Sequence, residues 1–173
     1  MFSLNSNLLK KIKNNLFPFY KNKDLKLVFK KLNENSSKEQ KIAMFVGGCV
    51  RKHLLNDSVD DIDIATILTS DQIKEKFKDS KFKIVETGIE HGTVTLVSDR
   101  LRLELTTLRK DIKTDGRHAE IEYTDDWKED SNRRDFTINA IYLDIKGNIF
   151  DPQMGVKDLK NNNVKFIGDP QKR

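Results

Sequence analysis

Apolar residues recur along the chain at two spacings, and each spacing predicts a different element. In 24–34 they lie three or four positions apart, which predicts an amphipathic helix. The run 42–46 is short and continuously apolar, which indicates a buried strand ending at a glycine pair. In 61–68 carboxylates alternate with isoleucines, as in a strand with one buried face. The apolar face of the first helix comprises Leu25, Val28, Phe29 and Leu32.

The rest of the chain continues this mixture of helices and strands. Thr69 and Gln72 have the spacing of a capping box, which predicts the start of a further helix. We expect a mobile loop at 110–119 and a hairpin over 137–152 with its turn at 146–148. Further strands are predicted within 81–86, 92–98, 101–108, 120–123 and the tail 161–173. The fold class is therefore α/β (α+β), with a mixed β-sheet of about five or more strands and flanking helices.

The N-terminal stretch has its own helical pattern. Apolar residues at 8, 9, 12 and 16 share a helix face, and Pro18 breaks the pattern. We expect residues 1–40 to form a helical segment that packs on a domain comprising 41–173. This stretch lacks the continuous apolar region and cleavage site of a signal peptide.

Composition restricts the function only slightly. The 173 residues fit one domain, and the formal net charge of +5 is compatible with a polyanion such as RNA, although generic solubility is the commoner explanation of such a charge. The single cysteine, Cys49, excludes an intramolecular disulfide and a thiolate metal cage. No apolar run reaches the length of a membrane span, so no membrane partner is expected and the predicted location is cytoplasmic.

Asp61 and Asp63 are the first candidate site. Alternate residues of a strand point to the same face, so both carboxylates would project together. Two close negative charges favour a cation, and hard oxygen ligands suit Mg²⁺. A strand that merely exposes an acidic face is the alternative, and for the bare D-x-D pattern it is the commoner case.

A glycine pair precedes these aspartates. Gly47 and Gly48, between a strand and a helix, would let the backbone approach phosphate oxygens, and Arg51 would add a guanidinium one turn later. Alone, the pair is a plain tight turn. Its combination with D-x-D on the next strand predicts metal ligands and phosphates in one cleft.

Glu104 is a candidate third carboxylate. It alternates with leucines that would face the core, so it would join the aspartates if its strand lies beside theirs. Two-metal phosphoryl transfer uses such a set of acids. An exposed strand residue paired with a lysine is an equal alternative.

With these residues in hand, the chain resembles the head domain of the bacterial tRNA nucleotidyltransferase and poly(A) polymerase family, which includes the CCA-adding enzymes. Several blocks agree in order from about Phe45 to the end of the chain. They are FVGGCVR…DIDIAT, TGIEHGTVTLV, LELTTLR, EDSNRRDFTINAIYLD and DPQMG. The resemblance implies the nucleotidyltransferase fold, with Asp61 and Asp63 as the metal pair and Glu104 as the third carboxylate.

The resemblance also implies nucleotide-binding roles. Gly48 and Arg51 would contact the triphosphate, Arg134 would bind the nucleotide, and Asp135 and Asn139 would lie near the ribose. Read without the family, Arg133 and Arg134 are solvated charges ending a helix. Asp135 is then a cap or turn residue, and Asn139 a hydrogen bonder at a strand end.

The chain departs from the family at three points. Lys52 stands where the family usually has an acidic residue, and His118 where it often has a second arginine. The family's E-D-x-x-R block, which pairs with the incoming base, would follow Arg173. We therefore expect the neck, body and tail domains to be absent from this polypeptide.

Three hypotheses about function follow. The first is a template-independent RNA nucleotidyltransferase head that adds nucleotides from ATP or CTP to an RNA 3′ end, with Mg²⁺ as cofactor; the resemblance implies that this RNA is tRNA. Activity would then need a second chain carrying neck and body if this is one subunit of a split enzyme. The second is a non-catalytic nucleotide- or RNA-binding remnant. The third, ranked low, is a small nucleotidyltransferase that modifies a protein or a metabolite.

Overall fold

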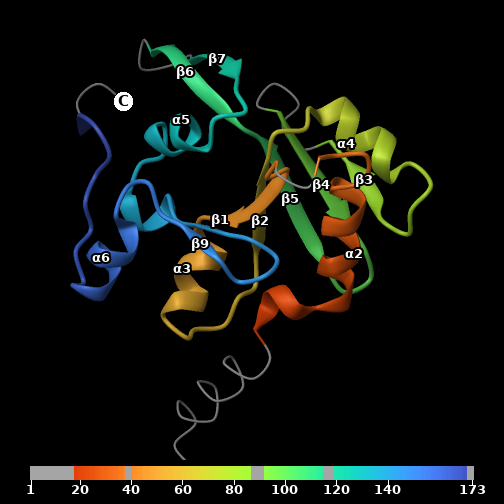
Figure 1. The fold of residues 1–173 in the computed structure, drawn as a ribbon, viewed down its shortest axis with the longest axis horizontal. Helices are drawn as coiled ribbons and strands as arrows, with labels where there is room; N and C mark the ends of the chain where they lie inside the picture. The colour runs from red at the N-terminus through yellow and green to blue at the C-terminus, as the bar shows by residue number, and fades with distance from the viewer. Residues whose placement is uncertain (1–17, 38–39, 87–91, 115–118, 171–173) are drawn as a thin grey trace, which may run out of the picture.

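The fold is built on a seven-stranded sheet, whose strands cross the middle of Figure 1. The computed structural model describes residues 18–37, 40–86, 92–114 and 119–170, so the predicted helix around 8–16 and His118 lie outside the described residues. β2 and β5 are parallel and all other neighbouring strands are antiparallel, which confirms the predicted mixed sheet. In spatial order the strands are β3 (Lys83–Val85), β4 (Thr93–Val97), β5 (Arg102–Thr107), β2 (Ile62–Thr66), β1 (Ala43–Val46), β8 (Tyr142–Leu143) and β9 (Ile149–Phe150).

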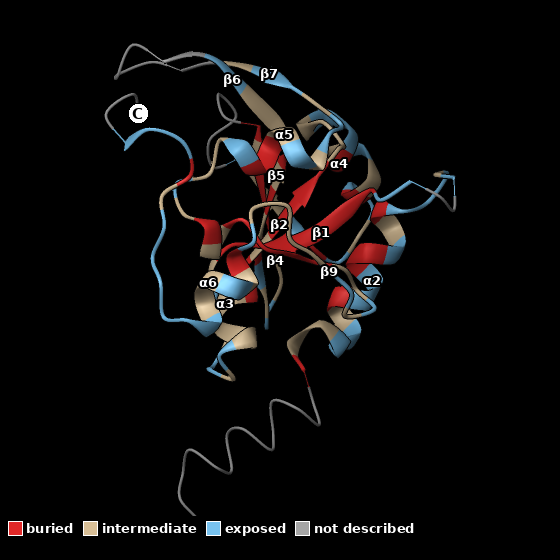
Figure 2. Ribbon diagram, turned by 60° about the vertical axis from the view of Figure 1, so that its left-hand side comes forward, coloured by how far each residue is buried: buried red, intermediate tan, exposed pale blue. Residues whose placement is uncertain are grey.

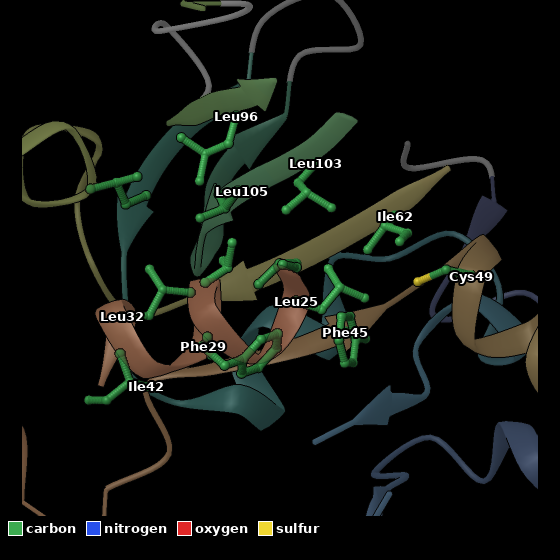
Figure 3. Packing of buried hydrophobic residues seen from close by; sticks show 14 of the residues in the cluster. Leu25, Phe29, Leu32, Ile42, Phe45, Cys49, Ile62, Leu96, Leu103 and Leu105 are labelled. Carbon is green, nitrogen blue, oxygen red and sulfur yellow. The ribbon is translucent and has the colours of Figure 1, made fainter. Parts of the chain in front are cut away.

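One face of this sheet carries the main core, covered by α2 (Lys23–Leu32) and α4 (Ser70–Phe77). Strand residues such as Ile64 and Leu105 point from this face toward the helices, while their neighbours in the chain point to the other face. Figure 3 shows the leucines of β4 and β5 above the apolar side chains of α2. The four residues predicted for the buried face of α2, namely Leu25, Val28, Phe29 and Leu32, are all buried.

The helix starts follow their sequence signals. The Thr69 hydroxyl accepts from the Gln72 backbone N–H and the Gln72 side chain accepts from the Thr69 N–H, which confirms the capping box. α3 (Gly48–Leu54) begins directly after the glycine pair. None of the helices in the described part of the chain combines the length and the apolar composition that crossing a membrane requires.

The other sheet face has a smaller apolar cluster around Tyr142 and Val46. Trp127 of α5 (Trp127–Asn132) packs edge-on against the Tyr142 ring, with 5.6 Å between ring centroids. The short elements η1 (Phe19–Lys21), η3 (Thr137–Asn139) and α6 (Gly155–Lys160) flank the sheet. Figure 2 shows the buried strands at the centre and exposed residues on the outer parts of α2 and α6.

Three predictions about secondary structure need correction. The loop predicted at 110–119 is wrong, because β6 (Arg109–Thr114) pairs with β7 (Ala119–Tyr123) in a separate two-stranded ribbon at the top of Figure 1. The tail strand is wrong too, since it makes only an isolated bridge between Phe136 and Phe166. The hairpin turn before Asn148 is confirmed, but β8 and β9 have two residues each and the preceding segment is the 3-10 turn η3.

Candidate active site

Two of the three predicted carboxylates lie side by side. Asp63 of β2 and Glu104 of β5 are direct partners in the parallel pair, so both side chains emerge on the face opposite α2. Asp61 is exposed and comes just before β2. The strand adjacency on which the role of Glu104 depended is therefore present.

The electrostatics of Asp63 reflect these neighbours. Burial raises the pKa of the Asp63 carboxyl above its ordinary value, and the negative charges of Glu104 and Asp61 raise it further. The positive charge of Arg134 acts in the opposite direction. A carboxylate whose charged form is disfavoured by burial and by like charges gains from a nearby cation.

The carboxylates do not form a closed metal cage. Among the described residues, no group of three or more histidine, cysteine, aspartate or glutamate side chains is arranged to hold a metal ion. The Glu104 side chain is 46% exposed and lies 3.6 Å from the Arg102 guanidinium, so its partner is an arginine rather than the lysine considered above. The donor set fits a hard divalent cation by its chemistry, because the oxygens are carboxylates that repel one another.

The glycine turn meets the same carboxylate. Gly47 precedes α3 with φ of 76°, a left-handed conformation that favours glycine. A Cβ atom added to Gly47 would lie 3.5 Å from Oδ2 of Asp63, whereas one added to Gly48 would meet no atom within 4 Å. The turn therefore borders Asp63 and leaves open space beside Gly48.

Two predicted nucleotide-binding residues from distant parts of the sequence are in contact. The Arg51 guanidinium of α3 donates a hydrogen bond to Oδ1 of Asn139 in η3. Asp135 is exposed, and its backbone carbonyl accepts from the Ile167 N–H at 2.9 Å. The contact between Arg51 and Asn139 thus joins α3 to the segment RRDFTINA (133–140), which we call the R-R-D block.

Arg133 and Arg134 are not solvated charges, so that interpretation is wrong. Both guanidinium groups pair with Asp130, whose side chain is fully buried, at 2.7 Å and 3.0 Å. The Tyr142 hydroxyl donates to the same carboxylate at 2.7 Å. The positive charge of Arg134 also acts on Asp63, where it partly opposes the rise in the carboxyl pKa. Arg134 thus acts on Asp63 electrostatically, while its guanidinium is paired with Asp130.

Asp130 and Tyr142 were missed from the sequence. Asp130 is one of several acidic residues in 125–130, and no pattern there marks which of them is buried. The available signal was spacing, because Asp130 precedes Arg133 and Arg134 by three and four positions. Residues at this spacing face one another at the end of a helix, and α5 ends at Asn132, just before the arginines. Tyr142 looked like an ordinary strand residue.

Residues 43–165 match the family described as Poly A polymerase head domain. The chain belongs to this family. It is 43% identical over 145 residues to human CCA tRNA nucleotidyltransferase 1, mitochondrial, a match that covers 83% of this chain and 33% of that protein.

Solved structures agree with this membership. The Bacillus stearothermophilus CCA-adding enzyme in complex with CTP superposes with a TM-score of 0.71 at 32% identity, over 84% of this chain and 33% of that one. A tRNA nucleotidyltransferase complexed with a primer tRNA and an incoming ATP analog gives a TM-score of 0.57 at 30% identity, over 73% and 36% of the two chains. The head-domain match thus spans about a third of the length of these longer relatives.

Proposed function

We propose that this chain is the catalytic head of an enzyme that transfers nucleoside monophosphates from ATP or CTP to the 3′ end of tRNA. Membership of the head-domain family supports this proposal, as do the names of the relatives. The single observation that carries it is the in-register pair Asp63–Glu104 beside the glycine turn. A strand that merely exposed acids would not need its carboxylate next to a glycine with positive φ.

The residues divide into two sets. Asp61 and Asp63, with help from Glu104, would hold Mg²⁺, which when bound lowers the pKa of an attacking hydroxyl and neutralises phosphate charge. Gly47, Gly48 and Arg51 would contact the triphosphate, and Arg134, Asp135 and Asn139 the rest of the nucleotide. The acids and the arginines thus provide opposite charges around one substrate.

The proposed reaction is a single displacement at phosphorus. The RNA 3′ oxygen forms a bond to the α-phosphorus as the bond from that phosphorus to the bridging oxygen breaks. Pyrophosphate leaves with that oxygen, and the hydroxyl proton passes to a nearby carboxylate or to water. The protein's own contribution is to orient the triphosphate and to stabilise its charge.

Incorporation of labelled nucleotide into tRNA lacking its 3′ end tests this function. The full chain is incubated with such tRNA, Mg²⁺ and labelled ATP or CTP, with Asp63→Asn as the inactive variant. Label in tRNA that disappears in the variant supports the proposal. A matched set of reactions adds the remaining two thirds of a longer relative as a separate chain.

The alternatives give different results. Label that appears only with the added chain indicates one subunit of a split enzyme. Nucleotide binding without label under either condition indicates a binding remnant. The limited coverage of the relatives, 33% of the human protein, is the observation that favours testing these two. Loss of neither binding nor label in Asp63→Asn would contradict the assigned roles.

A further inference from the structure

One buried carboxylate, that of Asp130, pairs with both arginines of the R-R-D block. Oδ1 of Asp130 accepts a hydrogen bond from Nε of Arg133 at 2.8 Å and forms an ion pair with Nη2 of the same arginine at 2.7 Å. Its Oδ2 accepts from Nε and Nη2 of Arg134 at 3.2 and 3.0 Å and from the Tyr142 hydroxyl at 2.7 Å. The backbone N–H of Arg109 donates to Oδ1 at 3.3 Å. Four residues thus converge on one fully buried side chain.

The charges in this cluster depend on one another. Burial alone would raise the pKa of Asp130, but the charges of Arg134 and Arg133 and the hydrogen bond from Tyr142 outweigh it, so the pKa is lowered. The two arginine side chains are only 14% and 16% exposed. A guanidinium that is buried to this degree needs a fixed anionic partner.

The cluster stands next to the candidate carboxylates. Tyr142 is the β8 partner of Val46, and Val46 is the β1 partner of Asp63, so one row across the sheet face links them. The Arg134 guanidinium lies over the Tyr142 ring, with 5.3 Å between Cζ and the ring centroid. Asp130 approaches Arg134 from α5, and its Oδ2 lies 3.0 Å from Nη2 of Arg134.

We propose that Asp130 is a positioning residue that fixes the guanidinium of Arg134, and with it Arg133, in the orientation that receives the nucleotide. This proposal rests on the proposed function. Two donors of Arg134, Nε and Nη2, are engaged by Asp130, and Nε also donates to the Tyr142 hydroxyl, so these contacts fix the plane of the guanidinium. Asp130 itself does not touch substrate.

Equilibrium binding of ATP and CTP in Mg²⁺ tests this role. Asp130→Asn keeps the shape of the side chain and removes its charge. Loss of a charge-assisted contact of this kind should weaken nucleotide binding about tenfold to a hundredfold. Asp144→Asn is the matched control. Asp144 also accepts several hydrogen bonds, in the β8–β9 turn, but has no arginine partner among the described contacts, so nucleotide affinity should stay unchanged.

A double variant separates positioning from general destabilisation. If Asp130 acts through Arg134, adding Asp130→Asn to Arg134→Gln should weaken binding by less than about threefold more. Additive losses, or an Asp130→Asn protein that binds as tightly as the wild type, overturn the inference while leaving the proposed function intact. A wild-type chain that binds neither nucleotide overturns both.

A measurement on the wild-type protein covers the case in which Asp130→Asn does not fold. In arginine-selective NMR, the Nε–H signals of Arg133 and Arg134 should exchange slowly in the free protein, and that of Arg134 should shift when ATP is added. Fast exchange of both signals, or no shift at saturating ATP, overturns the proposal.

Discussion

Asparagine in place of Asp63 should stabilise the free protein and abolish its stabilisation by Mg²⁺ with nucleotide. Asp63 and Glu104 are direct partners on neighbouring strands, so their side chains start roughly 4.8 Å apart. At that separation, repulsion costs about 0.9 kcal/mol at the dielectric constant of water and about 3.5 kcal/mol at an effective value of about 20. Because Glu104 is 46% exposed, we expect the low end, about 1 kcal/mol.

The raised pKa of Asp63 determines how the stability difference between the wild type and Asp63→Asn changes with pH. Burial and the charges of Glu104 and Asp61 favour its protonated form in the folded state, so wild-type stability falls as pH rises from 3.8 through the raised value. The advantage of Asp63→Asn should therefore be full at pH 7 and vanish below pH 3.8. Urea unfolding at several pH values, without divalent ions, measures it.

Mg²⁺ with ATP should reverse the order of stability of the wild type and Asp63→Asn. With Mg²⁺ and ATP at about a hundred times their dissociation constant, the wild type should gain about 2.7 kcal/mol and the variant much less. Asp144→Asn is the control of opposite sign, because hydrogen bonds outweigh burial and lower the pKa of Asp144, so its removal should destabilise at pH 7. An Asp63→Asn protein less stable than the wild type at pH 7 without cation would refute the reasoning.

Three further predictions concern packing, space and pH. Gly155→Ala should cost about 3 kcal/mol in urea unfolding, because the new Cβ would lie 2.0 Å from the Thr137 carbonyl oxygen, and an unchanged midpoint would contradict this. Gly48→Ala should change the unfolding free energy by less than about 0.5 kcal/mol, because no protein atom lies within 4 Å of the new Cβ. The same variant should bind ATP more weakly, because the methyl group would occupy the space proposed for a phosphate. Unaltered ATP affinity would count against a phosphate contact at Gly48. Burial lowers the pKa of His53 from 6.5, so the free energy of unfolding should fall as the pH drops below 6.5. If protonation of His53 causes this fall, His53→Phe should make the free energy of unfolding less dependent on pH.

Most of the main sheet could be predicted because its strands either alternate apolar and polar residues or, as in β1, are apolar throughout. The alternation in β2 and β5 marks which residues face the core, and the parallel register then brings Asp63 and Glu104 together. β6 could not be found in this way. Both faces of the β6–β7 ribbon are largely polar, with Ile112 itself 49% exposed, so no periodic apolar signal marks it.

The site was only partly visible in the sequence for a similar reason. The glycine turn pointed to Arg51, and the family resemblance implied Arg134 and Asn139, but neither signal says what each side chain contacts. The contact between Arg51 and Asn139 and the burial of Arg134 against Asp130 arise from tertiary packing of α3, η3 and α5. A buried carboxylate among several acids is recognised only once its surroundings are known.

Under the proposed function, Asp61 and Asp63 hold a divalent cation against a nucleoside triphosphate. A crystal of the full chain grown with Mn²⁺ and a non-hydrolysable ATP analogue tests it most directly through anomalous scattering. We predict a peak within about 2.2 Å of oxygens from both aspartates and from the triphosphate. An ordered triphosphate bound elsewhere, with no anomalous peak between these carboxylates, would contradict the account.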